Sequence, residues 1–199
     1  MSRRMRLYKG NRLPDEKTAN FAILKIAFLL TALDGHIDES ERAMFAKLAE
    51  QCKEIDVDQA RTVLHDVEKA TKRLLRAKKG RTDKAFLEIF LKEADAVCDW
   101  ASFVRDSRHV RRAFMMWTAM AMSDGDYAEI ERKAILLMMQ KVNSYPLIDK
   151  AFLEAAEKGI ERVRKIDARL FKAEDLETSK ALHEKLDGEY ARLAALVEG

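Results

Sequence analysis

The sequence predicts an all-α protein of about seven or eight helices that ends in a C-terminal helical extension. The 199 residues include only 7 Gly and 2 Pro, so helix breakers are scarce. Ala, Leu, Lys, Glu and Arg dominate the composition, and all five residue types favour helix. Apolar residues also recur three or four positions apart along most of the chain, which is typical of amphipathic helices.

Breaker and capping residues divide this pattern into segments. Pro14 suits the first position of a helix that ends at Asp34-Gly35, and Asp83 is expected to cap the fourth helix. Pro146 is expected to open the long charged C-terminal portion, and Asp187-Gly188 to mark a kink in the last helix. The expected helices span about residues 14–33, 38–52, 56–79, 83–104, 107–123, 128–142, 146–170 and a last segment from Leu182 to Val197.

The chain is expected to comprise three regions. Residues 1–13 form a flexible basic arm, residues 14–144 a helical domain, and residues 145–199 a helical extension that packs on the domain or projects from it. The extension is more charged than the domain, so it is a candidate for self-association as a homodimer.

Composition also bears on location. Residues 1–17 contain no apolar core of a signal peptide, and the longest apolar run, FAILKIAFLLTAL, is too short to cross a bilayer. Cys52 and Cys98 fall on apolar helical stripes and form neither a disulfide framework nor a metal-ligand spacing. These features favour a cytoplasmic protein with two buried, inert thiols.

Two short stretches repeat an acidic pattern. LLTALDGHIDESERAMF (29–45) and TAMAMSDGDYAEIERKAIL (118–136) both place Asp-Gly after an apolar helical run and Glu seven residues after that Asp. Most of the pattern is typical of helix punctuation, in which Gly ends one helix and a cap with Glu three residues later begins the next. Carboxylates at the C-terminal end of a helix face the negative end of its dipole, however, so punctuation alone does not require Asp34 or Asp124.

The two corners therefore have two interpretations, and helix punctuation is the simpler one. The other is a site for a divalent cation, Ca²⁺ or Mg²⁺, or for a protein partner, because hard cations prefer carboxylate oxygens. DGHIDESE matches the second half of an EF-hand loop, but the first two ligand positions fall on Leu30 and Ala32, which excludes that motif. The candidate metal ligands are Asp34, Asp38, Glu41, Asp124, Asp126 and Glu131.

The two motifs A-x-x-D-G-x-I-D-x-x-E and M-S-D-G-D-Y-A-E-I-E resemble the TerB tellurite-resistance family and the related domain of a membrane-anchored DnaJ-like cochaperone. The resemblance covers about residues 17–143. It implies two pseudosymmetric helical halves, no catalytic activity, an acidic metal site and a bacterial stress response with some inner-membrane association. The second motif has Ala128 where the first has Asp38.

Basic residues form two blocks. The first is the arm with Arg3, Arg4, Arg6, Lys9 and Arg12, and the second runs from Lys69 to Arg81 without an acid. An adaptor for an anionic membrane or nucleic acid is the alternative function, with Lys72, Arg73, Arg76, Lys78 and Lys79 as the anion-binding candidates. No aromatic residue interleaves with either block, so nucleic acid is the less favoured ligand.

Catalysis has no support in the sequence. It contains no nucleophile elbow, phosphate-binding glycine loop or metalloprotease motif, and an enzyme is not expected. The four His residues lack zinc-ligand spacing. Six Met residues near the second corner, Met115, Met116, Met120, Met122, Met138 and Met139, are expected to fill the core.

Overall fold

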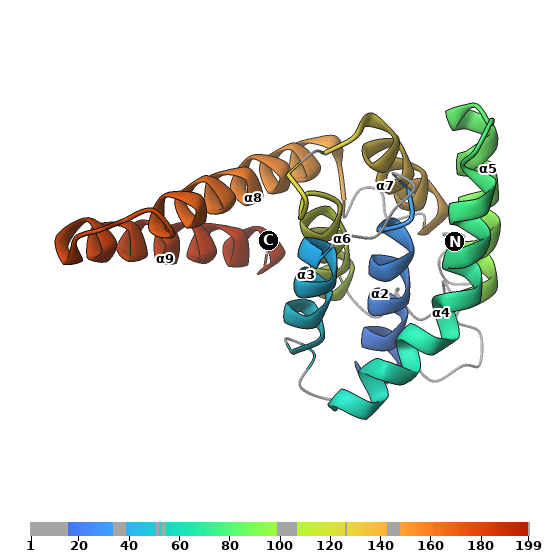
Figure 1. The fold of residues 1–199 in the computed structure, drawn as a ribbon, viewed down its shortest axis with the longest axis horizontal. Coiled ribbons are helices and arrows are strands. Elements are labelled where there is room, and N and C mark those ends of the chain that lie inside the picture. The colour runs from blue at the N-terminus through green and yellow to red at the C-terminus, as the bar shows by residue number, and fades with distance from the viewer. Residues whose placement is uncertain are drawn as a thin grey trace, which may run out of the picture.

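The structure confirms the all-α prediction. This computed structural model describes residues 16–33, 39–50, 52, 55–98, 107–125, 127–142 and 148–198, and no strand occurs in these ranges. The basic arm at residues 1–13 lies outside them. The helices are α2 (Glu16–Leu30), α3 (Glu39–Glu50), α4 (Val57–Ala77), α5 (Asp83–Val97), α6 (Ser107–Ala121), α7 (Glu129–Val142), α8 (Lys150–Leu170) and α9 (Leu176–Glu198) (Figure 1).

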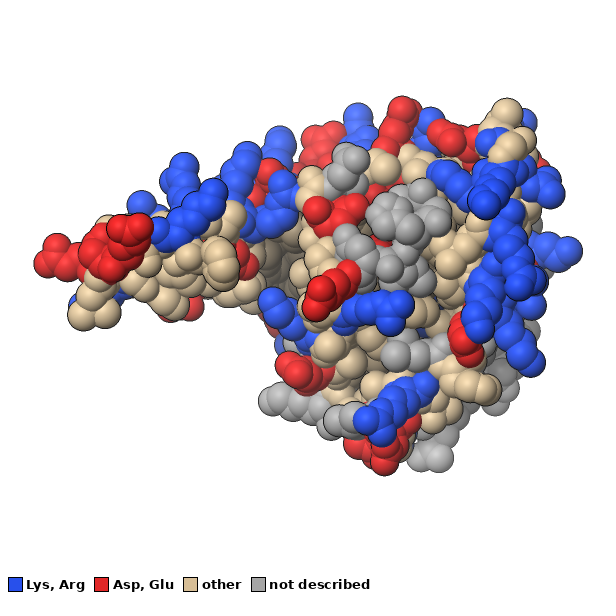
Figure 2. Space-filling model, in the orientation of Figure 1, with Lys and Arg blue, Asp and Glu red and all other residues tan. Residues whose placement is uncertain are grey.

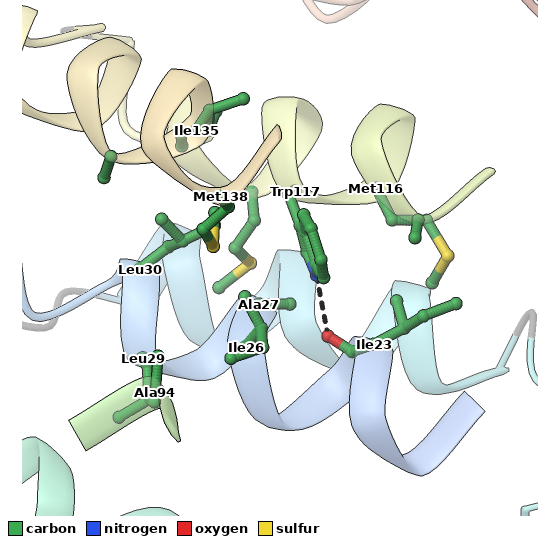
Figure 3. Close-up of a cluster of buried hydrophobic side chains, with 14 of the residues drawn as sticks. Ile23, Ile26, Ala27, Leu29, Leu30, Ala94, Met116, Trp117, Ile135 and Met138 are labelled. Carbon is green, nitrogen blue, oxygen red and sulfur yellow. Dashed lines mark hydrogen bonds between the residues drawn. The ribbon is translucent and has the colours of Figure 1, made fainter. Parts of the chain in front are cut away.

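Helix α2 forms the centre of the body. Its sequence, EKTANFAILKIAFLL, is apolar on nearly all sides of its second half, and a helix with that pattern has to be surrounded by other helices. It packs against α3, α4, α5 and α6. Figure 3 shows side chains of the neighbouring helices, among them Ala94, Trp117 and Met138, gathered around it.

A buried hydrogen bond joins α6 to α2. Trp117 is fully buried, and its indole Nε1 donates to the carbonyl of Ile23 at 2.9 Å (Figure 3). The bond satisfies the polar group of a large buried aromatic side chain and contributes about 1 kcal/mol to stability. It also fixes the position of α6 against α2, the central helix of the body.

Several helix ends differ from the sequence prediction. The N-cap of α5 is Thr82, whose Oγ1 accepts from the amide of Ala85 at 3.4 Å, so the prediction that Asp83 is the cap was wrong. Helix α8 begins at Lys150 behind the N-cap Asp149, four residues after Pro146. In both cases a Thr or Asp side chain satisfies an amide of the first turn, which fixes the start of the helix.

Further predictions about helix length need correction. Cys98 has extended backbone angles and ends α5 at Val97, so this helix does not continue to residue 104. Helix α9 begins at Leu176, six residues before the expected start at Leu182, and runs through Asp187-Gly188 to Glu198. Helix α4 ends at Ala77, two residues before the expected end at residue 79, and Gly80 in the following turn has φ +71°. Cys52 and Cys98 are buried free thiols, as expected.

Helices α8 and α9 form an antiparallel hairpin that projects from the body (Figure 1). Its base packs on α6, and Phe152, Leu153 and Ala156 of α8 are buried there. The two helices approach closely where Gly159 faces Leu193: a Cβ at position 159 would lie 2.5 Å from Leu193 Cδ2. The C-terminal extension is therefore a projecting arm with a packed base.

No helix among the described residues is both long enough and apolar enough to cross a membrane.

Candidate functional site

The first acidic corner connects α2 to α3. Asp34 and Asp38 belong to residues 34–38, which lie outside the described residues. Glu41 is described: it is the third residue of α3 and is buried, with 4% of its surface exposed. This position is where a capping box places its Glu.

The second corner connects α6 to α7 and shows its capping interaction directly. Gly125 has φ +96°, as the punctuation interpretation predicts, and α7 begins at Glu129. The carboxylate Oε2 of Glu131 accepts a hydrogen bond from the backbone amide of Ala128 at 2.9 Å. Glu131 therefore makes one of the two hydrogen bonds of a capping box, although Ala128 has no side-chain oxygen to make the other.

The remaining carboxylates of this corner differ in position. Asp124 is exposed, Asp126 lies outside the described residues, and Glu131 is 4% exposed. Among the described residues, no three His, Cys, Asp or Glu side chains come close enough to hold a metal ion. A metal site at the corners would therefore depend on Asp34, Asp38 and Asp126. The nearby methionines serve the core, where Met116, Met120, Met122 and Met138 are buried.

The second corner also contacts helix α8. The guanidinium of Arg164 lies so close to Gly125 that a Cβ there would be 2.7 Å from its Nη1. The Tyr127 hydroxyl donates to Glu157 Oε1 at 3.1 Å, and Arg132 Nε donates to the same oxygen at 2.9 Å. The second corner is thus an internal docking site for the hairpin.

This network affects the ionisation of its members. Burial, together with the neighbouring Glu157 carboxylate, raises the pKa of Tyr127 above its ordinary value. The hydrogen bond to Glu157 and its negative charge also raise the pKa of Arg132. Tyr127 therefore stays a hydrogen-bond donor and Arg132 stays a cation at physiological pH. The sequence prediction missed this role because Glu157 and Arg164 lie on α8, far along the chain from the corner.

The cations of the second basic block fall into two groups, those that bind other parts of the body and those that face solvent. Arg73 donates two hydrogen bonds to the buried carboxylate of Glu93, one of them from Nε at 2.8 Å. Lys78 Nζ donates to the carbonyl of Leu33 at 2.8 Å and lies 5.0 Å from the ring centre of Phe86. Both cations hold α4 in place, so they are less suited to bind an external anion.

The other cations of the block face solvent. Lys69, Lys72 and Arg76 are exposed, and their spacing of three or four residues places them on one side of α4, while the exposed Lys79 lies in the turn that follows the helix. Val63, Val67 and Leu74 are buried on the opposite side. We call the four exposed cations the α4 ridge. Figure 2 shows Lys and Arg side chains gathered along this part of the surface.

The ridge has few acidic neighbours in the sequence. Residues 69–84 contain eight Lys and Arg residues and one acid, Asp83. Glu68 pairs with Lys72, and the hydrogen bond from Lys72 lowers the pKa of Glu68. This exposed pair partly neutralises Lys72 and stabilises the helix only slightly. Arg76, Lys79, Arg81 and Lys84 extend the positive surface into the turn and the start of α5.

Comparison of the chain with protein-family models, with curated proteins and with solved structures found no match.

Proposed function

We propose that this chain is a non-catalytic helical module that associates with an anionic membrane surface through the α4 ridge. The observation that supports this function is the concentration of exposed cations on the side of α4 opposite the core. Such a face can approach a flat surface without any rearrangement of the fold. The association would be peripheral and electrostatic.

The expected strength follows from the charge. A Lys or Arg near an anionic leaflet contributes about 1 kcal/mol. Three such cations therefore change the partition coefficient by roughly 100-fold, since every 1.4 kcal/mol is a factor of ten. Salt weakens the attraction because the Debye length shortens to about 8 Å at physiological ionic strength.

A lipid surface suits the ridge better than nucleic acid does. Single-stranded nucleic acids bind to grooves in which bases stack on aromatic side chains. The ridge is one face of α4 and of the turn after it, and the large exposed hydrophobic side chains of the described residues all lie on α8, α9 or the turn between them. Phospholipid headgroups need only accessible positive charge, which Arg76 and Lys79 supply.

The test is co-sedimentation of the full chain with vesicles at low salt. We expect binding to vesicles that contain phosphatidylserine or phosphatidylglycerol, no binding to pure phosphatidylcholine vesicles, and release as salt increases. The variant Lys72→Glu, Arg76→Glu, Lys79→Glu should lose binding by roughly 100-fold or more, because each change reverses a charge.

A matched control separates the ridge from net charge. Arg42→Glu, Lys150→Glu, Lys158→Glu makes the same change in net charge at exposed positions on α3 and α8. This control should keep most of the vesicle binding. Equal loss in both variants would contradict a local site. Binding to a short duplex or single-stranded oligonucleotide but not to anionic vesicles would replace the membrane by nucleic acid as the ligand.

The second candidate function is that of a TerB-like module, which would bind a divalent cation or a protein partner through its acidic corners. Such a module would act in a bacterial stress response, in the cytoplasm close to the inner membrane. It is favoured by the likeness of the corners, since Glu41 and Glu131 are both the third residue of their helix and are equally buried. Its test is thermal unfolding with Ca²⁺ or Mg²⁺. A cation that binds the corners should raise the melting temperature of the wild type and not that of Asp34→Asn, Asp124→Asn. No shift in either chain would count against a metal.

A further inference from the structure

The large exposed hydrophobic side chains of the described residues lie on the hairpin. Phe171 is 93% exposed, Leu176 85% and Tyr190 50%. Phe171 and Leu176 flank the turn at the tip, the point of the arm farthest from the body (Figure 1). A Phe and a Leu that are both exposed at the end of a projecting arm indicate a contact with another molecule.

The outer half of the hairpin also lacks a covering layer. On α8 the buried residues end at Ile160, and Val163, Ile166 and Leu170 beyond it are only partly buried. On α9 the buried residues are Leu182 and Glu189. Helix pairs of this kind complete their core when two further helices pack against them, as in a four-helix bundle. The arm therefore presents an apolar seam as well as an apolar tip.

A groove of about 740 Å³ lies where the hairpin leaves the body. One wall is formed by α3 and α6, and the other by α8 and α9. Met44, Met115, Val163 and Leu193 are among its apolar residues. Figure 2 shows the molecule hollowed at this junction. Unbranched Met side chains adapt their shape to an inserted apolar group, so this groove can accept an aromatic ring.

The tip and the α3–α6 wall of the groove carry net charges of opposite sign. The tip carries three acids, Glu174, Asp175 and Glu177, and one cation, Lys172. The α3 and α6 residues that line the groove include Lys47, Arg108 and Arg112 and no acid. The acids at the groove come from other helices: Glu16 from α2, and Asp167 and Glu198 from the hairpin. Glu198 is paired with Arg108 at 2.6 Å.

We propose that the groove binds the hairpin tip of a second copy of this chain. In the resulting two-fold dimer, Phe171 and Leu176 of each copy insert between the hairpin and the α3–α6 wall of the other. The groove residues Ile160 and Val163 of α8 precede Phe171 at the tip by 11 and 8 residues, which is about 17 and 12 Å along the helix. Two arms that run antiparallel therefore place both tips on both grooves at once, which closes the assembly at a dimer.

The side-by-side arms explain the exposed seam. Each hairpin supplies two helices, and together they form a four-helix arrangement that covers the partly buried side chains of the outer half. The acidic tip of one copy meets Lys47 and Arg112 of the other, which selects the antiparallel orientation over the parallel one. This inference concerns a surface separate from the α4 ridge, so its outcome is independent of membrane binding.

The test is sedimentation velocity of the full chain over a range of concentrations. The wild type should sediment as a dimer, and Phe171→Ser, Leu176→Ser should raise the dissociation constant by roughly 100-fold, because aromatic and aliphatic anchors carry most of the energy of an interface. Both side chains face solvent in the single chain, so the melting temperature of the diluted variant should match that of the diluted wild type.

A charge exchange makes the test specific. Glu174→Lys, Glu177→Lys places cations on the tip, and Lys47→Glu, Arg112→Glu places acids on the groove wall. Each variant alone should be monomeric, since its tip and groove repel each other across the interface. A mixture of the two should form a heterodimer, because both of its contacts are then complementary.

Three outcomes would overturn the proposal. They are a wild type that stays monomeric at the highest soluble concentration, a dimer that Phe171→Ser, Leu176→Ser leaves unchanged, and a mixture of the charge variants that stays monomeric. A groove that instead binds a different protein would give the first of these results.

Discussion

The guanidinium of Arg164 lies against Gly125 in the second acidic corner, within 2.7 Å of where a Cβ would be. Arg164 belongs to α8, so the contact places a positive charge from the hairpin on the turn that carries Asp124. Electrostatic attraction to Arg164 favours acidic residues at this turn, independently of helix capping. The contact supplies a physical account of why this corner is acid-rich although Ala128 cannot cap.

Gly125→Ala should destabilise the protein. The φ of +96° is strained for a residue with a side chain, which costs about 1–2 kcal/mol, and the new methyl group would also displace Arg164. Gly80→Ala is the matched control, because Gly80 has φ +71° but nothing within 4 Å of its Cβ position. Chemical denaturation should show a larger loss for Gly125→Ala. Equal losses would mean that the contact with Arg164 contributes nothing.

Two glycines of the hairpin should respond in opposite directions to alanine. Gly159→Ala forces a Cβ to within 2.5 Å of Leu193, and overpacking of this kind costs about 1–3 kcal/mol. Gly188 lies in the middle of α9 with open space around it, so Gly188→Ala should stabilise the protein by about 0.5–1 kcal/mol. Denaturant midpoints measure both, and a stabilising Gly159→Ala would contradict the close helix approach.

Glu131 should behave as a capping residue. Glu131→Ala removes the acceptor for the Ala128 amide and should cost about 1 kcal/mol of unfolding free energy. Glu131→Gln keeps an acceptor, and Gln serves in capping boxes, so it should retain most of the stability. The exposed neighbour Glu129, which pairs with Lys133, is the control and should have a smaller effect. A large loss in Glu131→Gln would instead indicate a need for the negative charge.

The stability of the hairpin should depend on pH through the carboxyl group of Glu189. This carboxylate is 8% exposed and accepts from Arg162 Nε at 2.8 Å and from Arg192. The hydrogen bond from Arg162 is the main cause that lowers the pKa of Glu189 below its ordinary 4.5. A carboxylate with a lowered pKa stabilises the fold above its unfolded pKa and loses that contribution as pH falls through the folded value.

We therefore expect Glu189→Gln to melt at a lower temperature than the wild type at neutral pH. The difference should shrink as pH falls below about 4.5, because the wild-type carboxyl is then protonated too. Circular dichroism melts at several pH values test this. A difference that is constant with pH would show that the lost interaction does not depend on the charge of Glu189.

The fold class and most helices could be predicted from the sequence because they depend on local pattern. Phe86, Phe90 and Ala94 repeat at helical spacing, and all three are buried on α5. Helix ends were harder to predict, since Thr82 and Asp83 are both good caps and the backbone of the turn decides between them.

The candidate sites were predicted less completely. Lys72, Arg76 and Lys79 face solvent as the anion-binding prediction requires, but Arg73 and Lys78 bind groups of the body, namely Glu93 and Leu33. No local pattern distinguishes these cations, because their partners lie on other segments. The projecting arm and the groove at its base likewise arise from tertiary packing, so the sequence indicated only a charged extension.

The two buried thiols allow opening motions of the protein to be measured by the rate of thiol modification. Cys52 has no exposed surface and Cys98 has 6%, so a thiol reagent reaches either sulfur only after a local or global opening. When the protein closes again faster than the reagent reacts, the rate of thiol modification divided by the rate for an exposed thiol gives the fraction of molecules that are open. Single Cys→Ser variants then report separately on the chain after α3 and on the end of α5, with no label that alters the native state.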